Sequence, residues 1–379
     1  MNEYFEGAIR QLQARARHLI GLIPRGLERD IDALALRCRD RIDEAILELE
    51  NLLTNPSMQR PENQAIRIRR FRRVLDELDL LESVPIAALH RWGDPDRRMN
   101  RLTHQIAREI YFPLATPVVA CSAAWGDYYI TYPHLNFMCV PLAEHQFLLH
   151  LPDLYHELGH LLLSATNDPR LELFQQAYAE ALSTIYGHLA REMQSENRNT
   201  QGPQAYKQYL ATWLGCWESW LVELFCDLFA VYTVGPAFGW GHFHLCAGRG
   251  GNPVAVPKLA RTEHPADAAR MSVILLALER LGFFEEAARI KSWWDRLMDT
   301  VDAVETAEYL RCFPANLLET VVEKTFSGTQ AIGCQLAYPD MQEPIRRLLN
   351  DAWTQFWHSP IDYVNWEKLV ADSLEERLK

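Results

Sequence analysis

The chain has 379 residues, of which 48% are hydrophobic and 23% are charged, and this composition excludes a disordered protein. The formal net charge is −12. The first 110 residues hold 19 Arg and 18 acidic residues, whereas the rest hold 19 basic and 32 acidic residues. This distribution argues against a nucleic-acid or anionic-membrane surface on the C-terminal two-thirds, so we expect no nucleic-acid partner.

The cysteine pattern and the N-terminus bear on where the protein works. Eight cysteines occur without a CxxC pair, which favours reduced thiols in the cytosol. The N-terminal residues lack the basic start and apolar run of a signal peptide. No uncharged apolar stretch approaches the roughly 18 residues of a membrane span. We therefore expect a cytoplasmic protein that does not insert into a membrane.

Residues 1 to about 110 are predicted to be helical, because their apolar side chains recur at mixed spacings of three and four. Within this region, residues 67–73 hold five arginines. They form either a site for an anionic partner or a solvated helix face balanced by neighbouring acids, and we favour the solvated face. The N-terminal helices are also the expected surface for contacts with a partner or within an oligomer.

The helical pattern of the sequence ends at about Tyr111. Two β-prone runs, Tyr128–Tyr132 and Asn136–Val140, flank Pro133–Leu135. They predict a hairpin or a pair of short strands just upstream of the segment that carries the strongest chemical signal.

That segment is His156-Glu157-Leu158-Gly159-His160. Leucines recur around it at helical spacing, Pro152 and Asp153 suit a first turn, and the polar Asn167–Pro169 supplies a stop. Two histidines four apart on a helix project from one face, where they can share a Zn²⁺ ion. The glutamate between them can act as a general base toward a water molecule.

The remaining chain is predicted to be largely helical, with one irregular stretch. Glycine-rich text makes residues 239–256 the expected irregular segment. The predicted helices are residues 171–193, residues 204–234, which end at Gly235-Pro236, and most of the chain from Ala266 onward.

A catalytic zinc site of this kind needs a third protein ligand, and two glutamates compete for the role. Glu180 lies 20 residues after His160 in text that resembles the third-ligand helix of thermolysin, but Thr184 replaces the aspartate expected four residues later. Glu223 has Asp227 at the required spacing, on a helix rich in tryptophan, leucine and phenylalanine. Carboxylates in such apolar text need strong partners. Zinc would satisfy Glu223, and a zinc-bound histidine would satisfy Asp227, so Glu223 is favoured.

These motifs, followed by His264-Pro265 and by Arg270 six residues after the histidine, resemble the gluzincin metallopeptidases. The resemblance is closest to the HtpX and CAAX-prenyl-protease type and covers roughly residues 128–275. Membrane members of that group have transmembrane helices, which this sequence lacks. The resemblance implies that His264 approaches the substrate oxyanion and that Arg270 braces the acidic groups. His242 and His244 are rival ligands in the glycine-rich stretch.

The expected fold is mostly α: a zincin-like metallopeptidase core with a small β element, flanked by helical N- and C-terminal regions. The expected division is residues 1–110, 111–275 and 276–379. As in gluzincins, the second β-prone run is expected to bind an extended peptide as an added strand. The residues of that run are Asn136, Phe137, Met138, Cys139 and Val140.

The predicted function is a soluble zinc-dependent metallopeptidase with a peptide or protein substrate. His156, His160 and Glu223 would hold Zn²⁺, and Glu157 would take a proton from water and pass it to the leaving amine. One alternative is a regulatory or interaction protein with a structural zinc site, and another is a metal-dependent hydrolase of a non-peptide amide. Glu157 argues against the structural alternative, since a structural site has no need of a carboxylate between its histidines.

Overall fold

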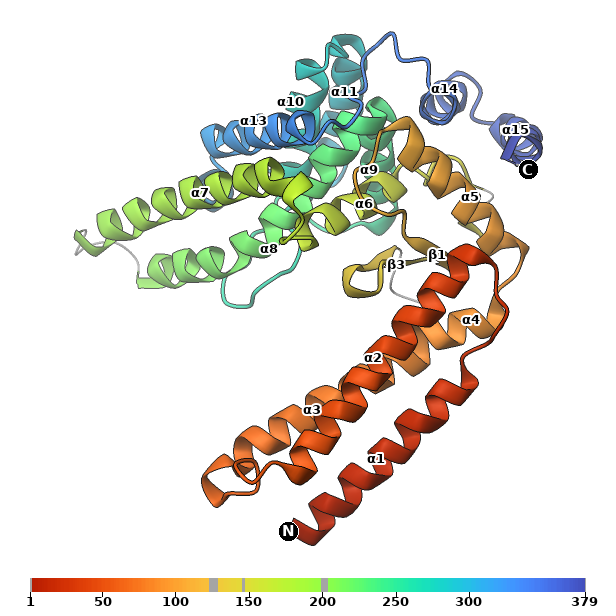
Figure 1. Cartoon of the computed structure of the whole chain (residues 1–379). Coiled ribbons are helices and arrows are strands. Elements are labelled where there is room, and N and C mark those ends of the chain that lie inside the picture. Colours follow the sequence, from red (N-terminus) through yellow and green to blue (C-terminus); the bar gives the residue numbers. More distant parts are fainter. Residues whose placement is uncertain (1, 123–128, 145–146, 199–203, 379) are drawn as a thin grey trace. The chain divides into compact units, whose positions relative to one another are not determined.

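The structure is a computed structural model, and it describes residues 2–122, 129–144, 147–198 and 204–378 (Figure 1). These residues are mostly helical and contain a small three-stranded sheet, which confirms the prediction of a mostly α chain with a small β element. The chain forms two compact units. The first comprises residues 1–100 and 117–142, and the second comprises residues 101–116 and 143–379. These units do not coincide with the three regions expected from the sequence.

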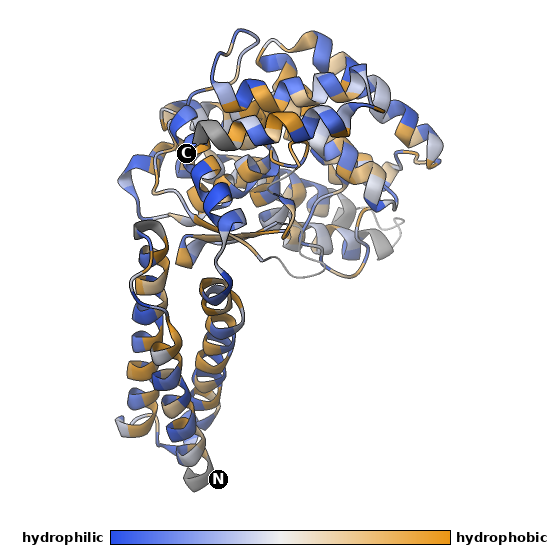
Figure 2. Cartoon of the chain, turned by 90° about the vertical axis from the view of Figure 1, so that its right-hand side faces the viewer, coloured by the Kyte–Doolittle hydropathy of each residue, from blue (hydrophilic) through white to orange (hydrophobic). Residues whose placement is uncertain are grey.

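The first unit contains the N-terminal helices and the sheet. Buried leucine, isoleucine and alanine side chains of its helices form one core with Val118, Ala120 and Phe137 from the strands. Hydrophobic and hydrophilic residues are interspersed along the N-terminal helices (Figure 2), and the buried ones of α1 (Ile9, Leu12, Ala16, Leu19) recur at spacings of three and four, as in an amphipathic helix. The elements are α1 (Asn2–Leu22), α2 (Arg29–Thr54), α3 (Gln64–Leu81), a π-helical turn (Glu82–Ile86), α4 (Ala87–Arg91), the start of α5 (Asp94–Glu109), β1 (Val118–Cys121), β2 (Ile130–Tyr132) and β3 (Phe137–Val140).

The arginine-rich segment lies on α3, where Arg69, Arg72 and Arg73 are exposed and the other two arginines have partners within the unit. Arg67 is buried and donates to the main-chain oxygen of Leu52, 3.0 Å away. Arg70 forms a two-pronged ion pair with Glu48. Both arginines therefore have a structural role, and neither supports the alternative of a site for an anionic partner.

The sheet has the order β1-β3-β2, with β3 parallel to β1 and antiparallel to β2. The antiparallel pair flanks a short turn that ends at Asn136, whose φ of 46° lies in the left-handed region that asparagine tolerates. The predicted pair of short strands around Pro133–Leu135 is thus confirmed, although Tyr128 lies outside the described residues.

The prediction that Asn136–Val140 receives a peptide as an added strand is wrong for this strand. β3 is the central strand, so both of its edges already pair with β1 and β2. The outer edge of β1 is also occupied, because Asn100 bonds both main-chain groups of Val119 and Asp96 accepts from the amide of Cys121. β-Augmentation needs an unpaired strand edge, and β3 has none.

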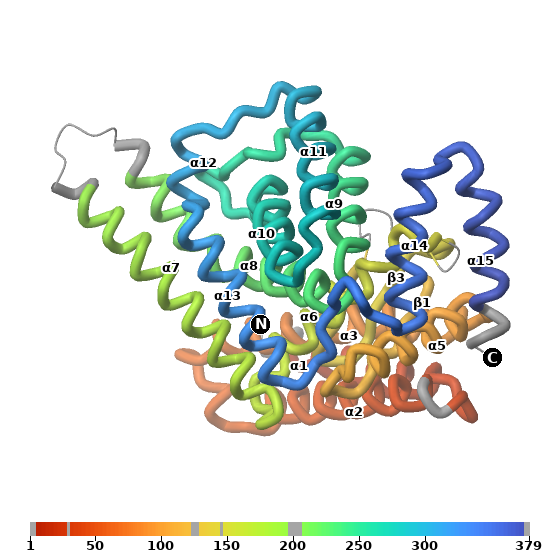
Figure 3. Tube along the Cα trace, turned by 90° about the horizontal axis from the view of Figure 1, so that it is seen from above, coloured from red at the N-terminus to blue at the C-terminus, as the bar shows by residue number. Residues whose placement is uncertain are grey.

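The second unit is built around one buried helix, α8, which packs against α6, α7, α9, α10, α13 and α14. α7 and α13 lie side by side (Figures 1 and 3). The elements are the end of α5, α6 (Asp153–Ser164), α7 (Glu172–Arg198), α8 (Gln204–Val234), α9 (Pro236–Arg249), α10 (Asp267–Arg280), α11 (Phe284–Thr300), α12 (Ala307–Cys312), α13 (Ala315–Ala331), α14 (Pro344–His358) and α15 (Tyr363–Leu378).

Helix α8 is buried on nearly every side from Trp220 to Val234 and carries mostly apolar side chains, which is the pattern of a helix surrounded by protein. Trp213, Trp217, Trp220, Phe225 and Phe229 are all fully buried. The helix ends where predicted, at Gly235, whose φ of 79° is accessible to glycine without strain.

The prediction of an irregular, glycine-rich stretch at residues 239–256 is wrong for its first half, which belongs to helix α9. Pro236 occupies the first turn, where a missing N–H does no harm. Gly239 serves close packing within the helix. A Cβ atom on Gly239 would lie 3.0 Å from Ile290 and 3.1 Å from Ile274.

Across the described segments, no helix has the length and apolar character that crossing a bilayer requires. All eight cysteine side chains are buried, and the described part of the chain contains no disulfide.

Candidate metal centre

The His156–His160 motif lies on α6, where the sequence predicts it, and α6 packs directly on α8. The contact is close because Gly159 faces Cys226 of α8. A Cβ atom at position 159 would lie 2.9 Å from the Cα atom of Cys226. This absence of a side chain lets the backbones approach closely enough for side chains of α6 and α8 to meet.

Three polar side chains converge at this contact. The Nε2 atoms of His156 and His160 are 3.2 Å apart. Carboxylate oxygens of Glu223 lie 3.5 Å from Nε2 of His156 and 3.7 Å from Nε2 of His160. Two imidazole nitrogens and one carboxylate therefore face the same small space.

The separations, which involve both oxygens of the Glu223 carboxylate, lie within about 0.1 Å of those expected around a tetrahedral divalent ion such as zinc. Bonds of about 2.0–2.2 Å at tetrahedral angles place neighbouring donors about 3.3–3.6 Å apart. Two histidines and one glutamate are also a ligand set that catalytic zinc uses. His156, His160 and Glu223 are thus the residues that would hold such an ion.

Asp227, one helical turn after Glu223, orients the first histidine. It is fully buried, and its Oδ1 atom lies 2.8 Å from Nδ1 of His156. When Nδ1 donates to Asp227, the Nε2 atom keeps its lone pair and faces Glu223 and His160. Arg270 of α10 in turn donates two hydrogen bonds of 2.6 Å to Asp227. The Arg270–Asp227–His156 chain therefore aligns one ring from behind.

The other two predicted site residues lie close by in sequence or space. Glu157 is on α6 between the histidines and is 6% exposed. His264 lies in the loop before α10, and its Nδ1 atom is 3.1 Å from the Glu223 carboxylate. The side chain of His264 is 63% exposed, whereas that of His156 is 10% exposed. Solvent therefore reaches the cluster on the side of His264.

Charge is distributed unevenly over the two histidines. Burial disfavours a charged His156, but hydrogen bonds with Asp227 and Glu223 raise its pKa to about 10. Burial and the neighbouring His156 both lower the pKa of His160. Burial opposes ionisation of Glu223 as well, yet hydrogen bonds from His156 and His264 hold its pKa well below the usual range. The surroundings thus favour positive charge between the rings, where a cation would lie.

Two other side chains compete with Glu223 as a third donor. Glu180 pairs with Lys324, 2.5 Å away, and with Gln176, so the structure does not bring it to the histidines. The Cys226 sulfur lies within 4.8 Å of donor atoms of both histidines. It packs against the backbone at Gly159, however, whereas an oxygen of Glu223 lies within 3.7 Å of the Nε2 atom of each histidine. Glu223 is therefore the best placed of the three side chains to act as the third donor.

Cys226 and Phe238 are the neighbours that the sequence reasoning missed. The ring of Phe238 on α9 stacks on His156 at 6.1 Å with an interplanar angle of 11°. Cys226 follows Glu223 by three residues, so helical spacing alone could have placed it near the site. Phe238 lies between the predicted helix stop at Gly235-Pro236 and the stretch expected to be irregular, and no local pattern indicates its contact.

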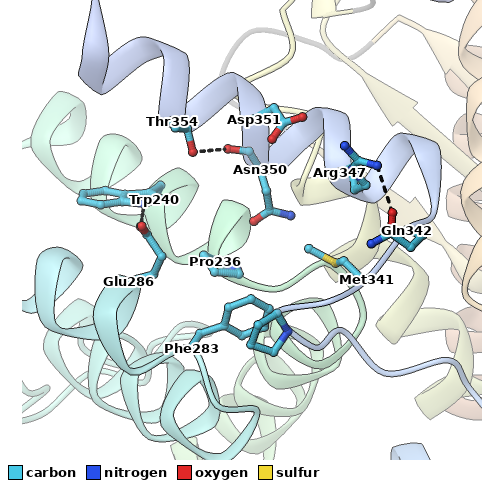
Figure 4. Close-up of a pocket in the computed structure, with 11 residues that line it drawn as sticks. Pro236, Trp240, Phe283, Glu286, Met341, Gln342, Arg347, Asn350, Asp351 and Thr354 are labelled. Carbon is cyan, nitrogen blue, oxygen red and sulfur yellow. Dashed lines mark hydrogen bonds between the residues drawn. The ribbon is translucent and has the colours of Figure 1, made fainter.

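A cavity of about 350 Å³ lies elsewhere in the second unit, between α9, α11 and α14 (Figure 4). Trp240 donates to Glu286 at 3.2 Å, and Arg347 donates to Gln342 at 3.1 Å, so part of the polar lining is internally paired. The residues that line it include none of the metal-centre cluster.

Comparisons with known proteins identify no relative of this chain. No family model, no curated protein and no solved structure matches this chain.

Proposed function

We propose that the protein is a zinc-dependent hydrolase, most simply a metallopeptidase of the gluzincin type with a zincin-like core. The observation that carries this proposal is the convergence of His156, His160 and Glu223, with donor separations of 3.2–3.7 Å. The chain of Asp227 and Arg270 behind His156 supports it, because ligand histidines in metal sites are usually oriented in this way.

Zinc, when bound, would supply Lewis-acid polarisation of a carbonyl group and would lower the pKa of a water molecule. Glu157 would accept a proton from the attacking water and deliver it to the leaving amine. His264, exposed and hydrogen-bonded to Glu223, would stabilise negative charge on the substrate oxygen. Arg270 does not reach the reacting atoms, so its part is to position Asp227 and thereby His156.

A purely structural zinc site fits the geometry less well. Structural zinc ions are usually enclosed by four protein ligands, whereas this cluster offers three and is exposed on the His264 side. Hydrolysis of a non-peptide amide uses the same groups, and the experiment below separates it from peptide cleavage by the substrates offered.

The test is hydrolysis of a mixed peptide library by the full chain, with cleavage sites read by mass spectrometry. Protein purified without added metal is expected to hold about one equivalent of zinc that depends on His156 and His160. Glu157→Gln should keep that zinc and the fold but lower turnover by several orders of magnitude, because the base is lost while the ligands remain.

Glu180→Gln is the matched control, since this exposed glutamate pairs with Lys324 and is expected to leave turnover unchanged. Near-normal turnover in Glu157→Gln would show that Glu157 is not the base. Cleavage of simple amides without any peptide cleavage would replace the peptidase proposal with the amidohydrolase alternative.

A further inference from the structure

A second group of metal-binding side chains lies where α9 and α10 meet. Donor atoms of His242, Cys246 and Asp267 all lie within 4.8 Å of one another. The Cys246 sulfur is 3.6 Å from Nε2 of His242. The two α9 residues are 2% and 7% exposed, so water is largely excluded from them. None of the three residues belongs to the cluster on α6 and α8.

The chemistry of these donors suits a borderline-soft divalent ion. Histidine nitrogen and cysteine sulfur are the ligands that zinc prefers, and a carboxylate oxygen is a common third. Bonds of about 2.0–2.1 Å to nitrogen and about 2.3 Å to sulfur at tetrahedral angles separate the two atoms by about 3.6 Å. The observed separation of 3.6 Å agrees with this value.

The position in the fold gives such an ion a structural purpose. His242 and Cys246 are one turn apart on α9, and Asp267 is the first residue of α10. Residues 250–266 between the helices form neither helix nor strand. Unstructured connections of this length are uncommon inside compact domains and are usually functional. A metal ion bound by both Cys246 and Asp267 would join the two ends of this loop.

The loop and the helix after it carry residues of the candidate metal centre. Trp213 and Trp220 of α8 donate to the main-chain oxygens of Pro257 and Thr262, at 2.9 and 3.1 Å. His264 follows in the same loop, and Arg270 lies one turn after Asp267. An ion at the junction would therefore hold the segment that presents both His264 and Arg270.

We propose that His242, Cys246 and Asp267 bind a second divalent transition-metal ion, best matched by zinc, that ties the end of α9 to the start of α10. A competing arrangement uses the same nitrogen. Nε2 of His242 is also 3.3 Å from the main-chain oxygen of Asp267, and a proton on Nε2 would make this a hydrogen bond and leave no lone pair for an ion. The two arrangements differ in metal content.

Titration of the metal-stripped full chain with Co²⁺ separates them. The parent protein is expected to take up about two ions per chain and to show the ultraviolet charge-transfer absorption of a cobalt–thiolate bond. Cys246→Ser should lose that absorption and one ion. Cys38→Ser, which alters a buried thiol of the first unit, and Cys226→Ser should keep both. Replacing His156 and His160 together by alanine should remove the other ion and keep the absorption.

Asp267→Asn serves as a second variant in case Cys246→Ser fails to fold, as judged by circular dichroism. It leaves the thiol in place and should weaken binding of this ion by at least about tenfold. Absence of the charge-transfer absorption from the parent protein would overturn the proposal. Loss of the absorption in Cys226→Ser but not in Cys246→Ser would also overturn it and would assign the thiolate to the first site. Because the two ions are counted separately, neither result depends on the proposed hydrolase activity.

Discussion

Asp227 is a fully buried carboxylate that serves two partners from different helices, and this shared role makes it the most constrained residue of the site. Its oxygens accept from Arg270 of α10 and from His156 of α6. Burial opposes ionisation of Asp227, but the nearby Arg270 holds its pKa well below the usual range. The carboxylate therefore stays charged, and the ion pair replaces the water that burial removes.

Asp227→Asn should lower the free energy of unfolding at pH 7 by about 3–5 kcal/mol, because the Arg270 guanidinium would remain buried without its counter-charge. Since the folded-state pKa of Asp227 is depressed, its stabilisation is present above the usual aspartate pKa of about 3.9 and is lost as the pH falls. The difference between parent and variant should narrow below about pH 4. Urea denaturation of the chelator-treated proteins at several pH values measures this.

Asp295→Asn is the matched control, because Asp295 forms an exposed pair with Lys291 and should change stability little. A difference between Asp227→Asn and the parent that widens toward acid would contradict the depressed pKa.

The identity of the third donor is a separate prediction. Glu223→Ala should weaken zinc binding sharply, and Asp227→Ala should weaken it by roughly 10–100-fold through misorientation of His156. Glu180→Ala and Cys226→Ala should leave the affinity nearly intact. Competition with a zinc chelator, beside circular dichroism as a check on folding, gives all four affinities. If Cys226→Ala releases the metal and Glu223→Ala retains it, the sulfur is the ligand.

At the scale of elements, the contact between α6 and α8 depends on Gly159. A methyl group there would meet the backbone of Cys226, which cannot move aside as a flexible side chain can. Gly159→Ala should therefore push the helices apart, lower the free energy of unfolding by about 1–3 kcal/mol and weaken zinc binding. Thermal unfolding and chelator competition on the same samples measure both effects.

Gly187→Ala is the matched control within α7. A Cβ atom at this exposed position meets nothing within 4 Å, so the substitution should stabilise the protein by about 0.5–1 kcal/mol through helix propensity. Stabilisation by both substitutions would show that the two helices have room to adjust.

Elements with a clear local pattern could be predicted from the sequence. α8 begins at Gln204 and ends at Val234 as expected, because a long apolar run and a Gly-Pro stop are both local signals. The start of the irregular stretch was predicted wrongly because a glycine such as Gly239 is locally a helix breaker. In the structure Gly239 lies within α9 and leaves room for Ile274 and Ile290. Close packing between distant segments leaves no periodic trace in the chain.

In the candidate site, too, only the features with a local sequence pattern could be predicted. The spacing of the two histidines on α6 is a local property, so their shared face was predictable, and so was the one-turn relation of Glu223 and Asp227. The pairing of Glu180 with Lys324 depends on how α7 meets α13, and no local pattern contains it. The parallel pairing of β1 with β3 is likewise a long-range contact, which is why β3 was expected at an edge.

At the scale of the whole molecule, the two compact units have separate cores. The proposed zinc ligands all belong to the second unit, so bound metal should stabilise that unit by mass action. Hydrogen exchange read by mass spectrometry should show faster exchange in α6, α8 and α10 after chelation and unchanged exchange in α1, α2 and α3. Equal acceleration in both units would mean that they open as one cooperative body.

The burial of α8 has a consequence for synthesis on the ribosome. Its apolar surface is covered by α6 and α7, which precede it, but also by α10, α13 and α14, which emerge later. At about 5–20 residues per second, the ribosome needs on the order of ten seconds to proceed from the end of α8 to α14. During that interval Trp217 and Trp220 lack part of their final cover, because the Phe313 ring that packs against both has not yet been synthesised. The nascent chain should therefore be a substrate for chaperones that bind exposed aromatic helices, and slowing translation after Val234 should increase aggregation.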